Sequence, residues 1–204
     1  KQAQKENNAI PNMNAEKDRT KKVRRASKIL LPTEDSDSHH QFSHLMASRT
    51  FYGDGSRVLK LGSIVHDRDQ DQFLLCIQPI CDSVRLKEPR VFVFVQMSRG
   101  GPENGNSASH VIFNSDNPAI ELVYHPKSYL CFATTFTPER TSQEVVACKD
   151  ENDELYFLDS EEKKYFWVDQ LRTSHAQRAV ERFASDLSRV GLTESDWLRR
   201  LEGK

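Results

Sequence analysis

Two apolar segments decide the fold of this chain: Phe73-Leu74-Leu75-Cys76-Ile77-Gln78 and Val91-Phe92-Val93-Phe94-Val95-Gln96-Met97. Both are short and rich in β-branched and aromatic residues, a composition that predicts strands buried at the centre of a sheet. Between them, the sequence Cys81-Asp82-Ser83-Val84-Arg85 places a thiol, a carboxylate, a hydroxyl and a guanidinium within five residues. Binding and catalytic residues concentrate on loops at the rim of a rigid scaffold. The sequence therefore predicts a site in this loop.

The composition is that of a globular chain with a large solvated surface. The 204 residues are 37% hydrophobic and 29% charged, which suits one domain with appendages. No apolar run approaches the roughly 18 residues that span a bilayer, and no basic segment followed by an apolar one marks a secretion signal. We therefore expect a cytoplasmic protein without membrane contact. Because the sequence opens at Lys1 instead of a methionine, it is also compatible with a domain upstream.

Charge is unevenly distributed along the chain. Residues 1–31 contain nine lysines and arginines against three acids, a balance of +6, whereas the remainder holds 20 basic and 27 acidic residues, a balance of −7. Such asymmetry suggests an arm with its own partner, or one that docks on the acidic body. The cations that can contact phosphates or an acidic partner are Lys21, Lys22, Arg24 and Arg25.

Helical patterns occur on both sides of the strand-rich region. Good helix formers predict a basic helix over 15–31, which Pro32 ends. A short second helix is expected over 37–48, where Phe42 and Leu45 share one face.

The C-terminal part of the sequence changes to a clear period of 3.6 residues. Apolar residues, Phe183 among them, form one face from Ser174 to Val190. Ser174 with Gln177 predicts a capping box at the start of this helix. Gly191 stands where a left-handed C-cap belongs, and a last helix is expected from Thr193.

The segment between the two helical regions consists of short strand-like runs separated by polar turns. We predict strands near 57–66, 72–78, 91–97, 109–113, 119–124, 129–136, 143–148, 154–158 and 164–168. Closely spaced short strands with turn signals favour a small barrel or sandwich. The predicted fold class is α+β: a partly open β-barrel with an N-terminal helical arm and two C-terminal helices packed on it. The expected units are the arm 1–31, a helix plus barrel 32–170, and a helical pair 171–204.

The four cysteines predict free thiols. Cys76, Cys131 and Cys148 lie in strand-like runs, where buried free thiols are usual in reducing compartments. A zinc site would require paired Cys-x-x-Cys or Cys/His spacing, but four residues separate Cys76 from Cys81 and no second pair matches them. We expect no bound metal, and the sequence offers no glycine-rich phosphate loop for a cofactor.

The Cys81–Arg85 loop has two interpretations. An arginine beside Cys81 can activate the thiol as a nucleophile, although no histidine is near in sequence to act as its base. His66 and His110, expected near strand ends, are the histidines that could approach it in space. The structural alternative is that Asp82 caps the turn, Arg85 pairs with it and Cys81 packs. A binding surface made of Cys81, Asp82, Ser83 and Arg85 is compatible with either.

Three histidines fall in the helix expected over 37–48. His40 and His44 are one turn apart, a spacing that can chelate a metal. Because no third ligand or catalytic glutamate follows in the sequence, a solvated helix face is the favoured interpretation of His39, His40 and His44.

The central strands resemble the barrel core of the MazF/PemK-type toxin endoribonucleases. The similarity lies in Leu61-Gly62-Ser63-Ile64-Val65, in the run from Leu74 to Pro79 and in the run from Val91 to Ser98. Ser63 replaces the acid usual in that family. The resemblance implies an SH3-like barrel and, if activity is retained, RNA cleavage with Arg68, Arg85 and Ser98 as transition-state stabilisers or acids.

A second resemblance covers more of the chain. Four segments are similar to an uncharacterised bacterial domain: Phe42-Ser43-His44-Leu45-Met46, Leu61-Gly62, the run from Cys76 to Arg85, and Ser188-Arg189-Val190-Gly191-Leu192. This domain forms the C-terminal half of receiver-containing, signalling or phage-defence proteins. The resemblance implies an upstream receiver and assigns no catalytic residue.

These observations favour a non-catalytic signalling or effector-interaction module of a bacterial regulatory or antiviral defence system. Its partner would be another protein or an upstream receiver-like domain, recognised at the Cys81–Arg85 loop. The first alternative is a toxin-like endoribonuclease on a MazF-type barrel. The second is a nucleic-acid-binding module that acts through the basic arm. Whether the chain is an enzyme stays open at this point.

Overall fold

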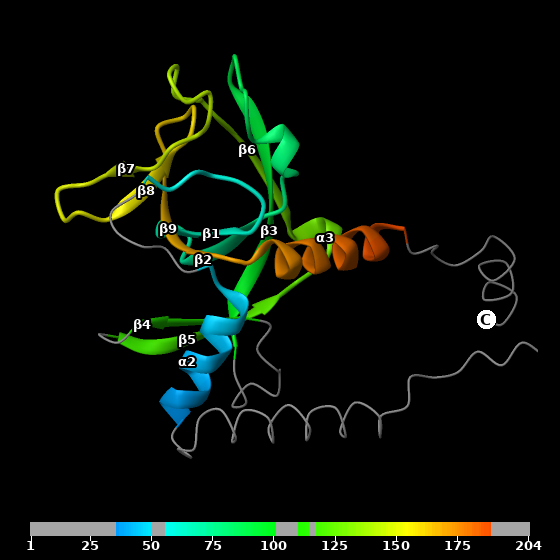
Figure 1. The fold of residues 1–204 in the computed structure, drawn as a ribbon. Coiled ribbons are helices and arrows are strands. Elements are labelled where there is room, and N and C mark those ends of the chain that lie inside the picture. The colour runs from blue at the N-terminus through cyan, green and yellow to red at the C-terminus, as the bar shows by residue number, and fades with distance from the viewer. Residues whose placement is uncertain (1–35, 50–55, 101–109, 115–116, 189–204) are drawn as a thin grey trace, which may run out of the picture.

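The computed structural model describes residues 36–49, 56–100, 110–114 and 117–188. Within these ranges the protein is α+β, with one mostly antiparallel sheet of nine strands and two α-helices (Figure 1). The sheet is open and not closed into a barrel. Neither of these two helices has the length and apolar character needed to cross a membrane.

The strands follow the short apolar segments of the sequence. They are β1 (Ser63–Asp67), β2 (Gln72–Cys76), β3 (Arg90–Arg99), β4 (His110–Asn114), β5 (Asn117–Tyr124), β6 (Cys131–Phe136), β7 (Cys148–Lys149), β8 (Leu155–Leu158) and β9 (Lys164–Gln170). The helices are α2 (Ser36–Ala47) and α3 (Thr173–Leu187), and two short 3-10 turns are η1 (Ile80–Asp82) and η3 (Ser128–Leu130). The strand order is β4-β5-β3-β2-β1-β9-β8-β7, and β6 also pairs with β3.

The long strand β3 is the branch point of the sheet. Along one edge its residues 94–97 pair with β2. Along the other edge residues 90–95 pair with β6, and residues 97–99 pair with β5. Because β6 and β5 use different parts of the same edge, the β4–β5 hairpin diverges from the rest of the sheet (Figure 1).

Helix α2 lies against β4 and is tied to the start of α3 (Figure 1). The Arg172 guanidinium donates hydrogen bonds to the carbonyls of Leu45 and Ser48, at 2.7 and 3.0 Å. Its backbone N–H also donates to Ala47, at 2.8 Å. A cation at the C-terminal end of a helix satisfies carbonyls that have no intrahelical partner and complements the helix dipole. This contact fixes α2 beside the end of β9.

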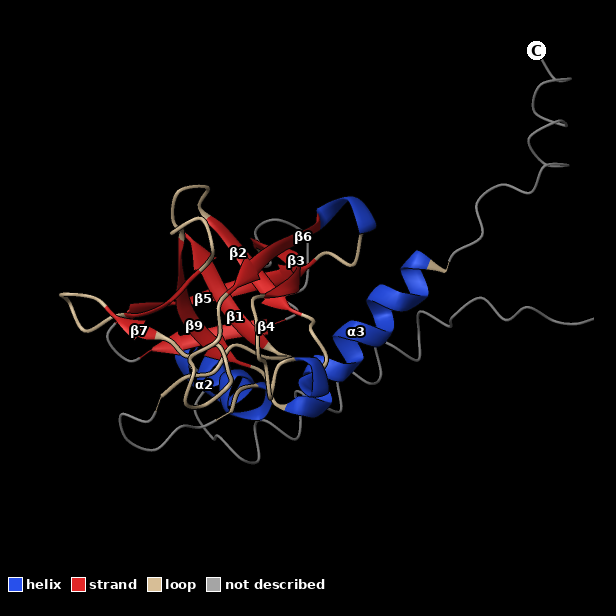
Figure 2. Ribbon diagram, turned by 90° about the horizontal axis from the view of Figure 1, so that it is seen from above, coloured by secondary structure: helices blue, strands red, loops and turns tan. Residues whose placement is uncertain are grey.

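The two faces of the sheet carry separate apolar clusters. In β2, Leu74 and Cys76 belong to one cluster, whereas Phe73 and Leu75 belong to the other, as the two-residue period of a strand requires. Helix α3 covers the second cluster with its buried residues Ala176 and Phe183. Figure 2 shows α3 starting beside the strands and running outward past them.

Gly62 permits the close approach of α3 to the sheet. Its φ of +86° lies in the left-handed region, and a Cβ atom there would be 2.9 Å from the Cβ of Ala176. Any larger residue would therefore be strained and would push the helix away.

The sequence-based strand assignments are confirmed, with shifted boundaries. All nine expected strands exist, although β1 begins only at Ser63 and β7 has just two residues. The helix expected over 37–48 is confirmed as α2. The expected α+β class is confirmed, and the strand order is that of an open sheet that does not close.

The helices expected near the two ends of the chain have different outcomes. Helix α3 is confirmed, but its N-cap is Arg172 and no side chain caps it, so the capping box of Ser174 and Gln177 is wrong. The helix expected over 15–31, with the basic arm, and the helix expected from Thr193 lie outside the described residues.

Candidate functional site

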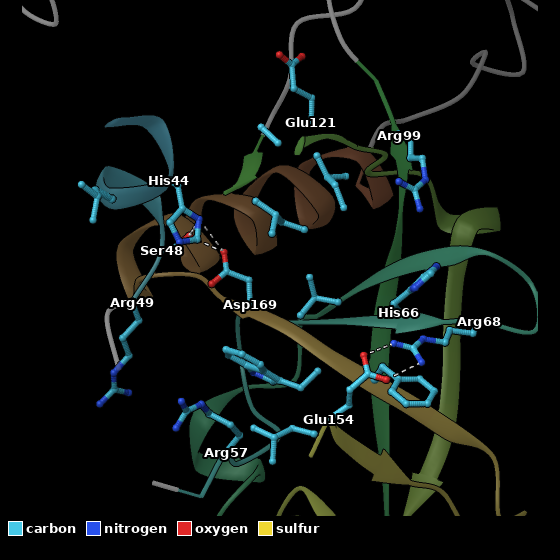
Figure 3. A pocket seen from close by; sticks show the side chains of 18 of the residues that line it. His44, Ser48, Arg49, Arg57, His66, Arg68, Arg99, Glu121, Glu154 and Asp169 are labelled. Atoms are coloured by element: carbon cyan, nitrogen blue, oxygen red, sulfur yellow. Dashed lines mark hydrogen bonds and ion pairs between the residues drawn. The ribbon is translucent and has the colours of Figure 1, made fainter. Parts of the chain in front are cut away.

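A cleft of about 1000 Å3 lies between the α2/β4–β5 side of the molecule and strands β1 and β9 (Figure 3). Its lining residues come from α2, β1, β4, β5, β8, β9, the end of β3 and the segments that join these elements. The branching of the sheet at β3 creates this space, since the β4–β5 hairpin turns away from the strands beside it. The volume is at the upper end of the range for small-molecule sites.

Four polar residues form what we call the floor cluster: His44, Ser48, His110 and Asp169. The Ser48 hydroxyl donates to Asp169 Oδ2 at 2.5 Å, and His110 Nε2 lies 2.8 Å from the same oxygen. His44 Nδ1 lies 3.5 Å from that oxygen and 3.1 Å from Ser48 Oγ. Ser48 is 2% exposed, and His110 and Asp169 are each 4% exposed. Figure 3 shows His44, Ser48 and Asp169 converging at one end of the cleft.

The floor cluster stabilises the ionised form of a buried carboxylate. Burial alone would raise the pKa of Asp169. The hydrogen bond and charge of His110, the Ser48 hydroxyl and the backbone N–H of Gln170 outweigh burial, so the pKa lies below its usual value.

The floor cluster is not a serine-nucleophile relay. In such a relay the serine and the acid bind different nitrogens of one imidazole. Here Ser48 donates directly to Asp169, and the same atom of His110, Nε2, faces both of them. The other ring nitrogen of His110, Nδ1, is buried and has no hydrogen-bond partner among the described residues. In this arrangement no imidazole stands between the Ser48 hydroxyl and the Asp169 carboxylate.

The walls of the cleft carry arginines that lie over aromatic rings of neighbouring strands. These pairs are Arg57 over Trp167 at 5.1 Å, Arg68 over Phe166 at 3.6 Å and Arg99 over Phe73 at 5.0 Å. On the same face His66 stacks on Phe73, with ring centroids 4.3 Å apart. We call these groups the arginine–aromatic wall. Planar cations held over planar rings offer both charge and stacking surface.

The acidic residues that line the cleft already have partners. Glu121 lies 3.0 Å from His40 Nε2, and Asp169 belongs to the floor cluster. Glu154 accepts two hydrogen bonds from Arg68, at 2.6 and 2.9 Å, which lower the pKa of Glu154. Both Arg68 and Glu154 are nearly half exposed, so this pair contributes little stability in water and can exchange for a ligand.

The Cys81–Arg85 loop lies outside the residues that line the cleft, and most of its polar side chains are exposed. Cys81 and Asp82 are exposed in η1, whereas Ser83 is buried and donates to the carbonyl of Pro79 at 3.0 Å. Arg85 is exposed with a φ of +57°. Within the described residues no hydrogen bond or ion pair joins Asp82 to Arg85, and no side chain caps η1, so the expected cap and pair are wrong.

The structure does not gather the residues proposed for RNA cleavage. Of the three, only Arg68 is among the residues that line the cleft. Ser98 is bonded to His125 at 2.7 Å, and Arg85 follows η1. The arm residues Lys21, Lys22, Arg24 and Arg25 lie outside the described part of the chain.

The histidines and cysteines also differ from expectation. His40 and His44 do not form a solvated face, because His40 contacts Glu121 and His44 joins the floor cluster. All four thiols are free, as expected, but only Cys76 is buried. Its burial raises the pKa of the thiol to about 12, which makes it inert. The burial expected for Cys131 and Cys148 is wrong, because both are exposed.

Comparison with known protein families, with curated proteins and with solved structures finds no match for this chain. The site must therefore be interpreted from its own residues. The sequence pointed to His44 and Arg68, and to His110 only as a histidine that could approach Cys81 in space, but not to Arg57 or Asp169. His110 on β4 and Asp169 on β9 are 59 residues apart, and they are brought together by the succession of strand pairings that runs from β4 through β5, β3, β2 and β1 to β9. The closely spaced His40 and His44 were the one local signal.

Proposed function

We propose that this domain is a non-catalytic recognition module that binds a nucleotide unit, a phosphate with its base, in the cleft. The arginine–aromatic wall is the observation that carries this proposal. Guanidinium groups bind phosphate oxygens in a bidentate manner, and bases stack on aromatic rings and on arginine planes. Arg57 with Trp167 and Arg68 with Phe166 provide both elements side by side in one cleft.

The nucleotide unit has two possible sources, a free nucleotide and a single-stranded nucleic acid. Both present the same chemistry to the arginine–aromatic wall, and the cleft volume of about 1000 Å3 accommodates a mononucleotide or a segment of a strand. Recognition at the Cys81–Arg85 loop is less well supported, because that loop lies outside the residues lining the cleft. The separation of Arg68, Arg85 and Ser98 likewise does not favour the ribonuclease hypothesis.

The biological setting of the module is proposed from the sequence resemblances. Similarity to the receiver-associated domain supports a cytoplasmic bacterial regulatory or antiviral defence protein, in which the bound nucleotide would act as the signal. An SH3-like barrel within the sheet is proposed from the MazF-type resemblance. The isolated bridge between Phe136 and Asp159, which draws β6 toward the end of β8, is in keeping with it.

Equilibrium binding to the full chain tests the proposal. The probes are a fluorescent adenine nucleotide, a fluorescent guanine nucleotide and a labelled twelve-residue single-stranded RNA of mixed sequence, each followed by anisotropy. Arg57→Gln is expected to weaken binding about tenfold or more, because it removes a cation that faces the cleft. Arg140→Gln is the matched control, since Arg140 is exposed and does not line the cleft.

The outcomes separate the two sources of the ligand. Tight binding of a nucleotide with weak binding of RNA identifies a sensor of free nucleotides, and the reverse identifies a single-strand binder. The proposal fails if none of the probes binds, or if Arg57→Gln and Arg140→Gln lose affinity equally.

A further inference from the structure

The floor cluster has the donor set of a transition-metal site. His44 Nδ1, His110 Nε2 and a carboxylate oxygen of Asp169 all lie within 4.8 Å of one another. They come from α2, β4 and β9, so three different elements of the fold converge on one point. Two imidazoles and one carboxylate are typical ligands of Zn2+ and of ferrous iron, whereas Mg2+ and Ca2+ prefer oxygen donors only.

The spacing of these atoms suits one ion. Four-coordinate zinc with bonds of about 2.0–2.1 Å places its ligand atoms about 3.3 Å apart. The observed distances from Asp169 Oδ2 are 2.8 Å to His110 Nε2 and 3.5 Å to His44 Nδ1, which bracket that value. Metal binding requires that the first pair separate slightly and that the Ser48 hydroxyl, which donates to Asp169, turn aside. It also requires that His44 Nδ1, which lies 3.2 Å from the Val111 carbonyl oxygen, release that hydrogen bond and carry its proton on the other ring nitrogen.

In the described part of the chain, Asp169 forms its ion pairs with no permanently charged side chain. Its salt-bridge partners are His110 and His44, and no lysine or arginine of the described residues is among them. A buried carboxylate is normally paired with a cation or coordinates a metal. The site is also reachable, because His44 and Asp169 line the cleft while His110 is buried behind them.

We propose that the floor cluster binds one divalent transition ion of the zinc class through His44 Nδ1, His110 Nε2 and Asp169, with one coordination position open toward the cleft. This inference goes beyond the nucleotide proposal and does not rest on it, because the ion binds in the absence of any nucleotide. A three-ligand site with an open position is the arrangement in which zinc also takes a water or a ligand oxygen.

Titration of the full chain with the metal alone tests this site. After treatment with EDTA and its removal, calorimetry with Zn2+ is expected to show one ion per chain, and Mg2+ is expected to give no binding. Co2+ is the spectroscopic probe. It should give the visible bands of a four-coordinate ion without the near-ultraviolet thiolate band that binding to the exposed Cys81, Cys131 or Cys148 would produce.

Two histidine variants locate the ion. His44→Gln is expected to weaken Zn2+ binding by about 100-fold or more. It is preferred over changes at the more buried His110 or Asp169, because the His44 side chain is 25% exposed, and circular dichroism checks that the variant folds. His125→Gln is the matched control, since His125 is half-buried and bonded to Ser98 outside the cleft, and it should keep the wild-type affinity.

The inference is overturned if wild-type protein binds no Zn2+, if Co2+ shows thiolate ligation, or if His44→Gln and His125→Gln behave alike. Each of these results would mean that the floor cluster is a hydrogen-bonded network without a metal. The nucleotide proposal would be unaffected, because its readout is anisotropy with Arg57→Gln.

Discussion

The floor cluster and the Cys81–Arg85 loop contain similar chemical groups in opposite structural settings. In the loop, a carboxylate, a hydroxyl and a guanidinium are neighbours in sequence, yet Asp82 and Arg85 are exposed and make no contact with each other. In the floor cluster, the groups come from distant parts of the chain, yet Asp169 and Ser48 are bonded at 2.5 Å and are almost fully buried.

This difference shows that nearness in sequence is a weak guide to a site in a sheet protein. A short turn directs consecutive side chains to different sides, whereas strand pairing brings residues of distant segments onto one face. The pairing of β1 with β9 carries Asp169 to the cleft, and Arg172 holds α2 and its His44 beside it. The following predictions test whether the two regions differ as strongly in energy as they do in geometry.

The largest expected difference in stability is between substitutions at two aspartates, one in each region. Asp169→Ala leaves buried polar groups of Ser48 and His110 without their partner, and should lower the free energy of unfolding by about 3–5 kcal/mol. Asp82→Ala removes an exposed side chain and should change it by less than about 0.5 kcal/mol. Urea unfolding followed by circular dichroism measures both. Equal effects of the two substitutions would contradict the distinction between the regions.

The dependence of stability on acid pH should also differ between these aspartates. Because folding lowers the pKa of Asp169, its ionised form contributes stability above the unfolded-state pKa, and this contribution is lost as the pH falls through the lower folded-state pKa. The wild-type protein should therefore lose more stability than Asp169→Asn between about pH 5 and pH 2. Asp82→Asn, a change at an exposed side chain, is the comparison variant, and a wild-type curve parallel to that of Asp169→Asn would refute the assignment.

A smaller change in stability, of opposite sign, is expected from a substitution at Arg85 in the loop. Arg85 has a φ of +57°, a conformation that glycine adopts without the steric cost borne by other residues. Arg85→Gly should therefore raise the free energy of unfolding by up to about 1 kcal/mol. Arg90→Gly is the control, because Arg90 has ordinary strand geometry at the start of β3. This substitution should lower the free energy of unfolding. Destabilisation at both positions would show that Arg85 makes contacts that matter.

The smallest change in stability is expected from chemical modification of the Cys81 thiol in the loop. Cys81 is exposed, whereas Cys76 is buried with a pKa raised to about 12. Iodoacetamide should therefore label Cys81, Cys131 and Cys148 in the folded protein and reach Cys76 only after unfolding. Mass spectrometry identifies the labelled residues. The labelled protein should unfold within about 0.5 kcal/mol of the untreated one, and labelling of Cys76 in the native state would refute its burial.

Local patterns were sufficient to predict most of the fold. The runs from Phe73 to Gln78 and from Val91 to Met97 identified β2 and β3, and the apolar face after Ser174 identified α3. Each of these patterns consists of residues that are close together in the sequence. The capping box failed, because Arg172 is drawn to the carbonyls at the end of α2. That contact links residues more than a hundred positions apart and leaves no local pattern.

The candidate site could not be predicted to the same extent. The branching of β3 between β5 and β6, which opens the cleft, depends on competition between strands for one edge. Arg57 and Asp169 are isolated in the sequence, so nothing distinguishes them from other polar residues, and His110 was noted only as a histidine that could approach Cys81. The sequence drew attention to His44 only because it lies one helical turn from His40. The residues that it meets in the floor cluster, His110 and Asp169, are on β4 and β9.

Hydrogen exchange with and without ligand tests the central claim, that the cleft and not the Cys81–Arg85 loop is the recognition surface. The full chain is saturated with whichever nucleotide or RNA binds most tightly, and peptide exchange is followed by mass spectrometry. We predict slower exchange in α2 and in β1 and β9, with no change in residues 80–86. Protection confined to residues 80–86, with α2, β1 and β9 unchanged, would contradict the account.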